Sequence, residues 1–192
     1  MYAMFNDNGS FNQDISSWDV SNVTDMHGMF GALENTLSFN QPIENWDVSS
    51  VTDMSYMFYR HYNFNRDISN WNVSKVTNMM RMFNRAHQFN QPIGSWDVSS
   101  VTNMQDMFNF ANSFNQNLNE WDTSNVTNMD GMFAGGNTTF NQPIGNWDVS
   151  SVENMRYMFG YSKNFNQPLG NWNTSSVTNM NAMFTESNFN QD

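Results

Sequence analysis

The residues best suited to chemistry are acidic side chains that follow tryptophan at nearly regular intervals. They are Asp19, Asp47, Asp97, Asp122 and Asp148, with Asn72 and Asn173 completing the series. If such carboxylates stack on neighbouring repeats, their oxygens suit calcium, or their field attracts a basic partner. The structural alternative is that each Asp accepts hydrogen bonds from the nearby Ser and backbone. We favour the structural interpretation, with no other metal site, and keep a calcium-binding column as a hypothesis.

A second regular series consists of threonines and suggests a different chemistry. Its members are Thr24, Thr52, Thr77, Thr102, Thr127 and Thr178, with Glu153 in the remaining place. Flat rows of threonine on repeat proteins can bind ice, which makes ice binding a minor alternative by analogy alone. The row here is single and adjoins a turn, where Thr has a local structural role.

Catalytic motifs are missing from the sequence. The chain has no cysteine, and His27, His61 and His87 stand at unrelated places, with no HExxH, GxSxG or phosphate-binding glycine loop. We therefore expect no enzyme activity and no cofactor. Seven Lys and Arg against 18 Asp and Glu, a net charge of -11, disfavour nucleic acid as a partner. No apolar run approaches the roughly 18 residues of a membrane span.

The side chains are positioned by a sequence repeat of about 25 residues. One copy, FNQPIGNWDVSSVENMRYMF, occupies 140–159, and seven copies begin near Phe11, Phe39, Phe64, Phe89, Phe114, Phe140 and Phe165. A fixed period predicts a repeat architecture in which each unit covers its neighbours. We expect one array over 1–192 with partial repeats at both ends, either a fragment of a longer array or a chain whose ends meet neighbours.

Within each copy the pattern predicts a short strand and a short helical turn. Trp-Asp-Val alternates apolar and polar residues, as in a half-buried strand. After a Ser, Asp or Asn precedes Met-x-x-Met-Phe, as if capping a helix. We expect the asparagine after the first Phe to form a side-chain ladder. The eight inward residues of the fourth copy are Phe89, Ile93, Trp96, Val98, Val101, Met104, Met107 and Phe108. The tryptophans expected inside are Trp18, Trp46, Trp71, Trp96, Trp121, Trp147 and Trp172.

The frame FNQPIGNWDVSSVTNMxxMF resembles the repeat of the BspA-like surface proteins, a divergent branch of the leucine-rich-repeat solenoids. The resemblance covers essentially the whole chain. It implies a secreted or cell-surface binding scaffold, in a family with members implicated in adhesion, and it assigns no catalytic residue. Combined with the preference of parallel crossovers, the sequence predicts a right-handed leucine-rich-repeat-like β/α solenoid.

Residues that differ between copies are the candidates for recognition, because repeat proteins keep their frame and vary their binding surface. We select Tyr56, Arg81, Arg156 and Tyr157 from the Met-x-x-Met-Phe segments, since aromatics and Arg are enriched in binding hot spots. We expect them to lie along one edge and to contact a protein or glycan. The alternatives are neutral variation on a solvated face, and an array that assembles with itself end to end into a filament or layer.

Overall fold

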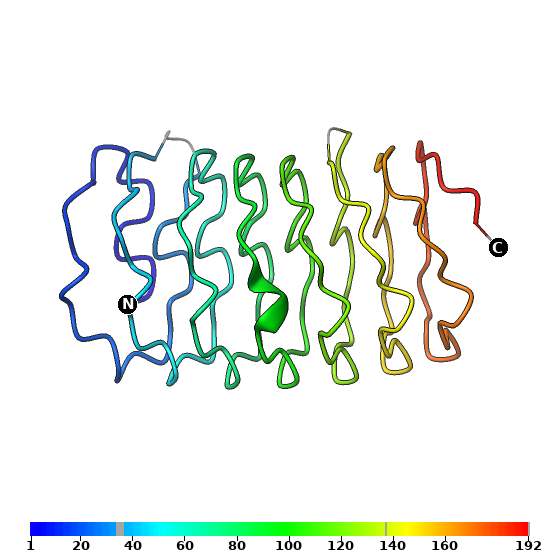
Figure 1. Cartoon of the computed structure of the whole chain (residues 1–192), viewed down its shortest axis with the longest axis horizontal. Coiled ribbons are helices and arrows are strands. Elements are labelled where there is room, and N and C mark those ends of the chain that lie inside the picture. The colour runs from blue at the N-terminus through cyan, green and yellow to red at the C-terminus, as the bar shows by residue number, and fades with distance from the viewer. Residues whose placement is uncertain (34–36, 137, 192) are drawn as a thin grey trace.

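The computed structural model describes residues 1–33, 37–136 and 138–191. The chain winds through similar coils that stack side by side along one axis, with the two termini toward opposite ends (Figure 1). In the described part the one helix is η1, a 3₁₀ helix at Ile93–Ser95. No helix there is long and apolar enough to cross a membrane.

The expected β/α solenoid is wrong in its elements. The described residues contain no strand, and β pairing between successive coils is limited to single-residue parallel bridges. These bridges link Asp25, Asp53, Asn78, Asn103, Asn128, Asn154 and Asn179 in order. Pairing therefore occurs at the Asp or Asn before Met, and the Trp-Asp-Val segment, where the strand was expected, forms none.

The expected helical turn is replaced by tight turns that overlap along Met-x-x-Met-Phe. In one coil, Met82 N donates to Met79 O (3.1 Å), Asn84 N to Arg81 O (3.2 Å) and Ala86 N to the carbonyl three residues before it (3.0 Å). Arg81 and Arg85 have φ of 57° and 62°. A right-handed helix cannot pass through two such residues, whereas a type II turn requires positive φ at its third residue.

Neighbouring coils are held together by backbone hydrogen bonds from alternate amides of this turn segment. Tyr56 N donates to Met80 O (2.8 Å), and the amide nitrogens two residues before and after it donate to Asn78 O and Met82 O (3.0 Å each). The same bonds recur between the later coils. Because a single coil has no partner for these amides, stacking is a condition of folding.

The interior is a continuous apolar core, and the eight inward positions predicted for the fourth coil are confirmed. All eight are buried, with at most 3% of their surface exposed. Phenylalanine rings stack in columns: the rings of Phe83 and Phe108 lie 5.8 Å apart, and those of Phe89 and Phe114 lie 5.9 Å apart. Stacked rings add to the stabilisation from burial alone.

Tryptophan burial was predicted for all seven residues and holds for the five inner ones. Trp46, Trp71, Trp96, Trp121 and Trp147 are 3–4% exposed. Each inner indole donates to a backbone carbonyl of the preceding coil, as Trp96 Nε1 does to Ile68 O (3.2 Å). The prediction is wrong for Trp18, which is 37% exposed, and for Trp172, which is partly buried. Both residues belong to outer coils, where fewer neighbouring side chains cover the indole ring.

Polar ladders satisfy backbone groups between the coils. Asn90 N donates to Asn65 Oδ1 (2.9 Å), and Asn115 N donates to Asn90 Oδ1 (3.0 Å), which confirms the predicted asparagine ladder. The threonine series also satisfies backbone carbonyls of the neighbouring coil, since Thr77 Oγ1 donates to Thr52 O (3.2 Å). These threonine hydroxyl protons are therefore engaged with the protein's own backbone.

Trp96→Ala removes a buried ring and leaves the Ile68 carbonyl without its indole donor. We expect the free energy of unfolding to fall by about 3–5 kcal/mol, measured by chemical denaturation. Trp18→Ala is the matched control, and because Trp18 is partly exposed it should cost clearly less. Equal losses at the two positions would contradict the burial described here.

His61 is a buried polar residue at a position where two other coils carry Ala86 and Ala111. It is 0% exposed, and neither ring nitrogen makes a hydrogen bond in the described structure. Burial lowers the pKa of His61 to about 4, and the nearby Phe39 backbone opposes this shift only in part. The unfolded chain therefore binds a proton between pH 6.5 and 4 that the folded chain excludes.

Stability should consequently decrease as the pH falls through this window, by about 2 kcal/mol between pH 7 and pH 5. His61→Ala should remove most of this pH dependence. A smaller pH dependence should remain because of His87, whose pKa is also lowered by burial and by Arg85. Denaturation at both pH values measures the difference. An unchanged pH slope in His61→Ala would show that the imidazole is hydrated.

Candidate recognition face

Three of the four predicted partner-binding residues occupy one structural position. Tyr56, Arg81 and Tyr157 are the second variable residue of Met-x-x-Met, with φ of 57°, 57° and 53°. Arg156 precedes this position and is exposed. The prediction that all four residues lie along one edge therefore holds for three of them, and Arg156 lies next to that edge.

This left-handed position recurs along the chain with side chains of very different kinds. Its members are Ala3, Gly28, Tyr56, Arg81, Asp106, Gly131, Tyr157 and Ala182, all with positive φ. Glycine adopts such a conformation without strain, whereas other residues incur a cost of about 1 kcal/mol or more. The bulky side chains of Tyr56, Arg81 and Asp106 therefore occupy positions where the backbone conformation favours glycine. We call the side chains at this position the variable row.

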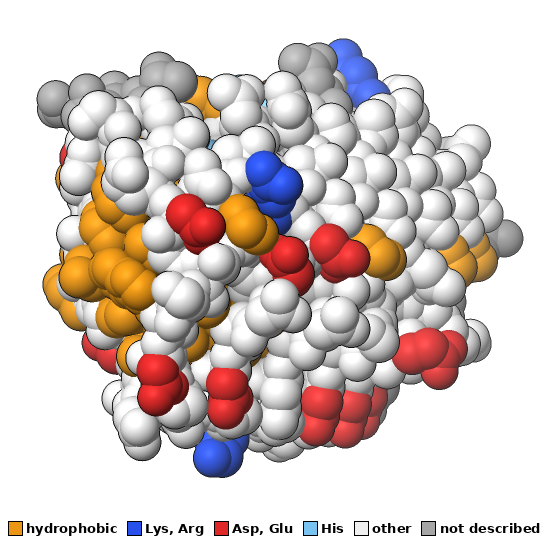
Figure 2. Space-filling view, turned by 60° about the vertical axis from the view of Figure 1, so that its left-hand side comes forward, with side chains coloured by type: hydrophobic (Ala, Val, Ile, Leu, Met, Phe, Trp, Pro, Cys, Tyr) orange, Lys and Arg blue, Asp and Glu red, His pale blue; other side chains and the backbone are white. Residues whose placement is uncertain are grey.

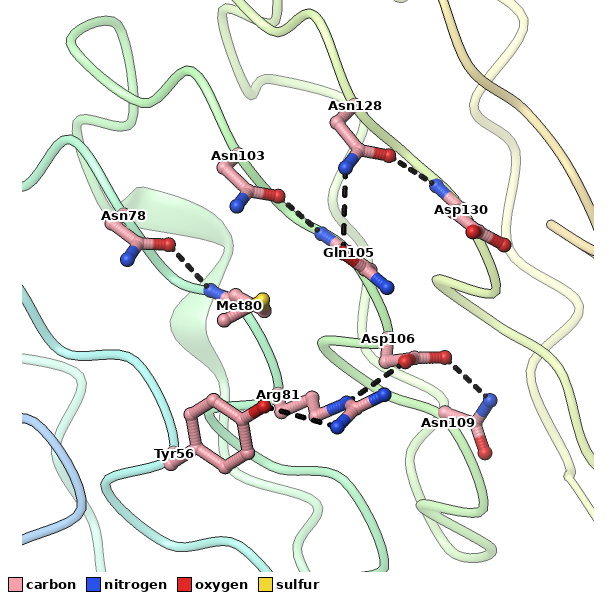
Figure 3. A network of polar contacts seen from close by, with 10 residues as sticks. All are labelled: Tyr56, Asn78, Met80, Arg81, Asn103, Gln105, Asp106, Asn109, Asn128 and Asp130. Atoms are coloured by element: carbon pink, nitrogen blue, oxygen red, sulfur yellow. Dashed lines mark hydrogen bonds and ion pairs between the residues drawn. The ribbon is translucent and has the colours of Figure 1, made fainter. Parts of the chain in front are cut away.

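The central part of the variable row is a connected polar network (Figure 3). Arg81 Nε donates to Asp106 Oδ2 (2.9 Å), and Arg81 Nη1 donates to the Tyr56 hydroxyl (3.0 Å). The guanidinium carbon also lies 5.5 Å from the Tyr56 ring centroid. Asn109 Nδ2 donates to Asp106 Oδ1 (2.8 Å). One charged group thus joins three successive coils on the surface.

Arg81 and Asp106 form the one ion pair in the described part of the chain, and their side chains are 35% and 14% exposed. Burial alone would lower the pKa of Arg81, but hydrogen bonding to Asp106 and its charge outweigh burial and raise it. Arg81 therefore keeps its positive charge at any physiological pH.

Next to this network the surface is hollowed over two glycines. Gly131 and Gly135 occupy the left-handed positions of one coil, and a hollow of about 320 Å³ lies among Arg81, Asp106, Arg156 and Tyr157. A Cβ atom on Gly131 would collide with Oδ1 of Asp106. Three predicted residues therefore meet at this hollow, and Tyr56 is connected to it through Arg81.

Sequence reasoning missed several members of the hollow. Asp106, Phe110, Asp130, Gly131 and Gly135 line it but were not selected. Asp130 is notable because burial, together with the charge of Asp106, raises its pKa, against the opposing effect of Arg156. The usable signal was the segment MDGMFAGG at 129–136, in which glycine replaces the bulky residues of neighbouring copies.

The acidic column lies elsewhere and has a structural role. Ser99 N and Oγ both donate to Asp97 Oδ1 (3.1 and 2.6 Å), and equivalent bonds form at Asp19, where the pKa is likewise lowered by the serine. Asn72 accepts the same pair of bonds from Ser74. Figure 2 shows acidic side chains at intervals along the lower edge of the stack. Among the described residues, no three acidic or His side chains cluster as metal ligands, so calcium binding stays an untested hypothesis.

Comparison with known families supports the repeat. Residues 1–43, 31–138 and 110–192 each match the family described as "Mycoplasma protein of unknown function, DUF285". The chain belongs to this family. Three overlapping matches within one chain are what a repeated family unit produces. A search of curated proteins found no match. The family description assigns no function.

Replacing Arg81 tests the left-handed position. Arg81→Gly and Arg81→Ala both remove the ion pair, but glycine adopts φ near 57° without strain, so Arg81→Gly should be more stable by about 0.5–1 kcal/mol. In a helical turn the order reverses, because alanine is the better helix former by about 1 kcal/mol. Chemical denaturation of the two variants measures the sign. Greater stability of Arg81→Ala would contradict the turn geometry.

Proposed function

We propose that the chain is a recognition and adhesion scaffold that works outside the cell or on its surface and binds a protein or glycan partner through the variable row. The observation that carries the proposal is the network of Tyr56, Arg81 and Asp106 beside the hollow. Frame side chains are engaged in the core and the ladders, whereas the variable row combines charge and aromatic rings at solvent-accessible positions. The resemblance to BspA-like surface proteins supports the same location and function.

The test is a quadruple alanine variant of Tyr56, Arg81, Arg156 and Tyr157. Folding should be largely kept, because Ala3 and Ala182 already occupy the left-handed position and partly exposed sites tolerate substitution. Binding should be measured on an array of extracellular-matrix proteins and immobilised oligosaccharides. We expect the parent to bind at least one component and the variant to lose about tenfold or more in affinity.

Retained binding in a folded variant would move the site away from the variable row. Absence of any binding by the parent would contradict recognition itself. Trp18→Ala is a suitable control, because Trp18 lies outside the variable row and its loss should leave binding unchanged.

End-to-end assembly is the second candidate, favoured by the apolar surface of the last described coil. A hollow of about 360 Å³ there is lined by Leu169, Trp172, Met180, Met183, Phe184 and Phe189. At the other end, where hydrophobic side chains gather in Figure 2, Tyr2 is 66% and Met4 52% exposed. A second copy stacked coil on coil would bury both surfaces. Light scattering that shows one particle size at all concentrations would exclude this assembly.

A further inference from the structure

The hollow beside the variable row exists because one coil omits two side chains that its neighbours carry. Asp106 and Phe110 occupy the two left-handed positions in the preceding coil, and Tyr157 and Tyr161 occupy them in the following coil. The coil between them has Gly131 and Gly135. The Asp106 and Phe110 side chains of the preceding coil lie against the two glycines. The hollow of about 320 Å³ is thus bounded by glycine backbone and neighbouring side chains, and it is near the lower size limit of small-molecule sites.

The rim of the hollow has balanced charge. Arg81 and Arg156 contribute two positive groups, and Asp106 and Asp130 contribute two negative groups. Only Arg81 and Asp106 pair as ions among the described residues. A single cation would meet repulsion from Arg156 and a single anion would meet repulsion from Asp130. Balanced donors and acceptors instead suit a neutral ligand rich in hydroxyl groups, which donate to carboxylates and accept from guanidinium.

Aromatic rings supply the apolar part of the rim. Phe110, Tyr157 and Tyr161 line the hollow, and Tyr161 is 48% exposed. Two of these rings contact arginines: the guanidinium carbon of Arg85 lies 4.7 Å from the Phe110 ring centroid, and that of Arg156 lies 5.1 Å from the Tyr157 ring centroid. Aromatic side chains offer a large apolar contact area at low entropic cost.

We infer that this hollow binds a neutral saccharide, with the C–H face of one sugar ring against Tyr157 and Tyr161 and its hydroxyls on Asp130, Arg156 and Asn109. This inference rests on the proposed recognition function and specifies its ligand class. A pyranose combines an apolar face with an equatorial belt of hydroxyls, which is the combination the rim presents. A lysine side chain of a peptide would lack the hydroxyl groups, and a sulfate would lack the apolar face.

The experiment uses the full chain and saturation-transfer NMR. The neutral probes are glucose, galactose, mannose, N-acetylglucosamine and their disaccharides cellobiose, lactose and chitobiose. Nα-acetyl-lysine methylamide and glucuronic acid serve as the cationic and anionic probes. We expect saturation transfer to at least one neutral sugar, and affinity about tenfold or more weaker in the Tyr157→Ala/Tyr161→Ala variant. Tyr62→Ala is the matched control, because Tyr62 stacks on His87 at another place (4.7 Å) and should bind normally.

Asp130→Asn provides a second variant that keeps the size of the side chain. It should weaken sugar binding while the melting temperature stays the same, because Asp130 forms no ion pair with any residue that the structure describes. Absence of transfer to every neutral sugar, preferential binding of a charged probe, or full binding by the double variant would each overturn the inference. If the parent still attaches to a protein on the array and the quadruple variant does not, only the sugar class fails and recognition stands.

Discussion

The structure depends on backbone hydrogen bonds that run from alternate amides of one turn segment to the carbonyls of the next coil. Tyr56 N, Arg81 N and Asp106 N each donate to the following coil at 2.7–2.8 Å. A left-handed residue at this point closes the tight turn within the coil while its own amide faces the neighbour. The geometry that joins the coils also brings the variable row to the surface. Structure and recognition therefore share one position, and sequence variation there leaves the bonding pattern unchanged.

Stacking also determines the composition of the core. Because each coil repeats the register of the last, identical residues lie above one another, and the phenylalanine columns follow directly. Side chains with spare polar groups satisfy the neighbouring backbone, as Trp96 Nε1 does with Ile68 O. Such a core is built from nearest-neighbour contacts alone. The outermost coils show the consequence, since Trp18 remains partly exposed.

The sequence was sufficient to predict the repeat and its inward residues, because burial of large apolar side chains depends on their period. It was insufficient for the turns. Asn78 Oδ1 accepts from Met80 N (3.2 Å), the local bond of a helix cap, yet no helix follows. Met-x-x-Met-Phe places apolar residues on one side in a helical turn and in overlapping tight turns alike. Only the backbone hydrogen bonds between coils determine which of these two conformations forms. Gly131 leaves a hollow only because Asp106 and Tyr157 occupy the same position in the neighbouring coils. That proximity depends on stacking and cannot be read from the sequence of one copy.

The most direct test of this account is amide NMR on the intact chain at Tyr56, Arg81 and Asp106. We expect slow hydrogen exchange at all three amides, because each donates to the next coil, and we expect the coupling constants of positive φ. Negative φ, or rapid amide exchange, at these three residues in the folded protein would contradict this structure.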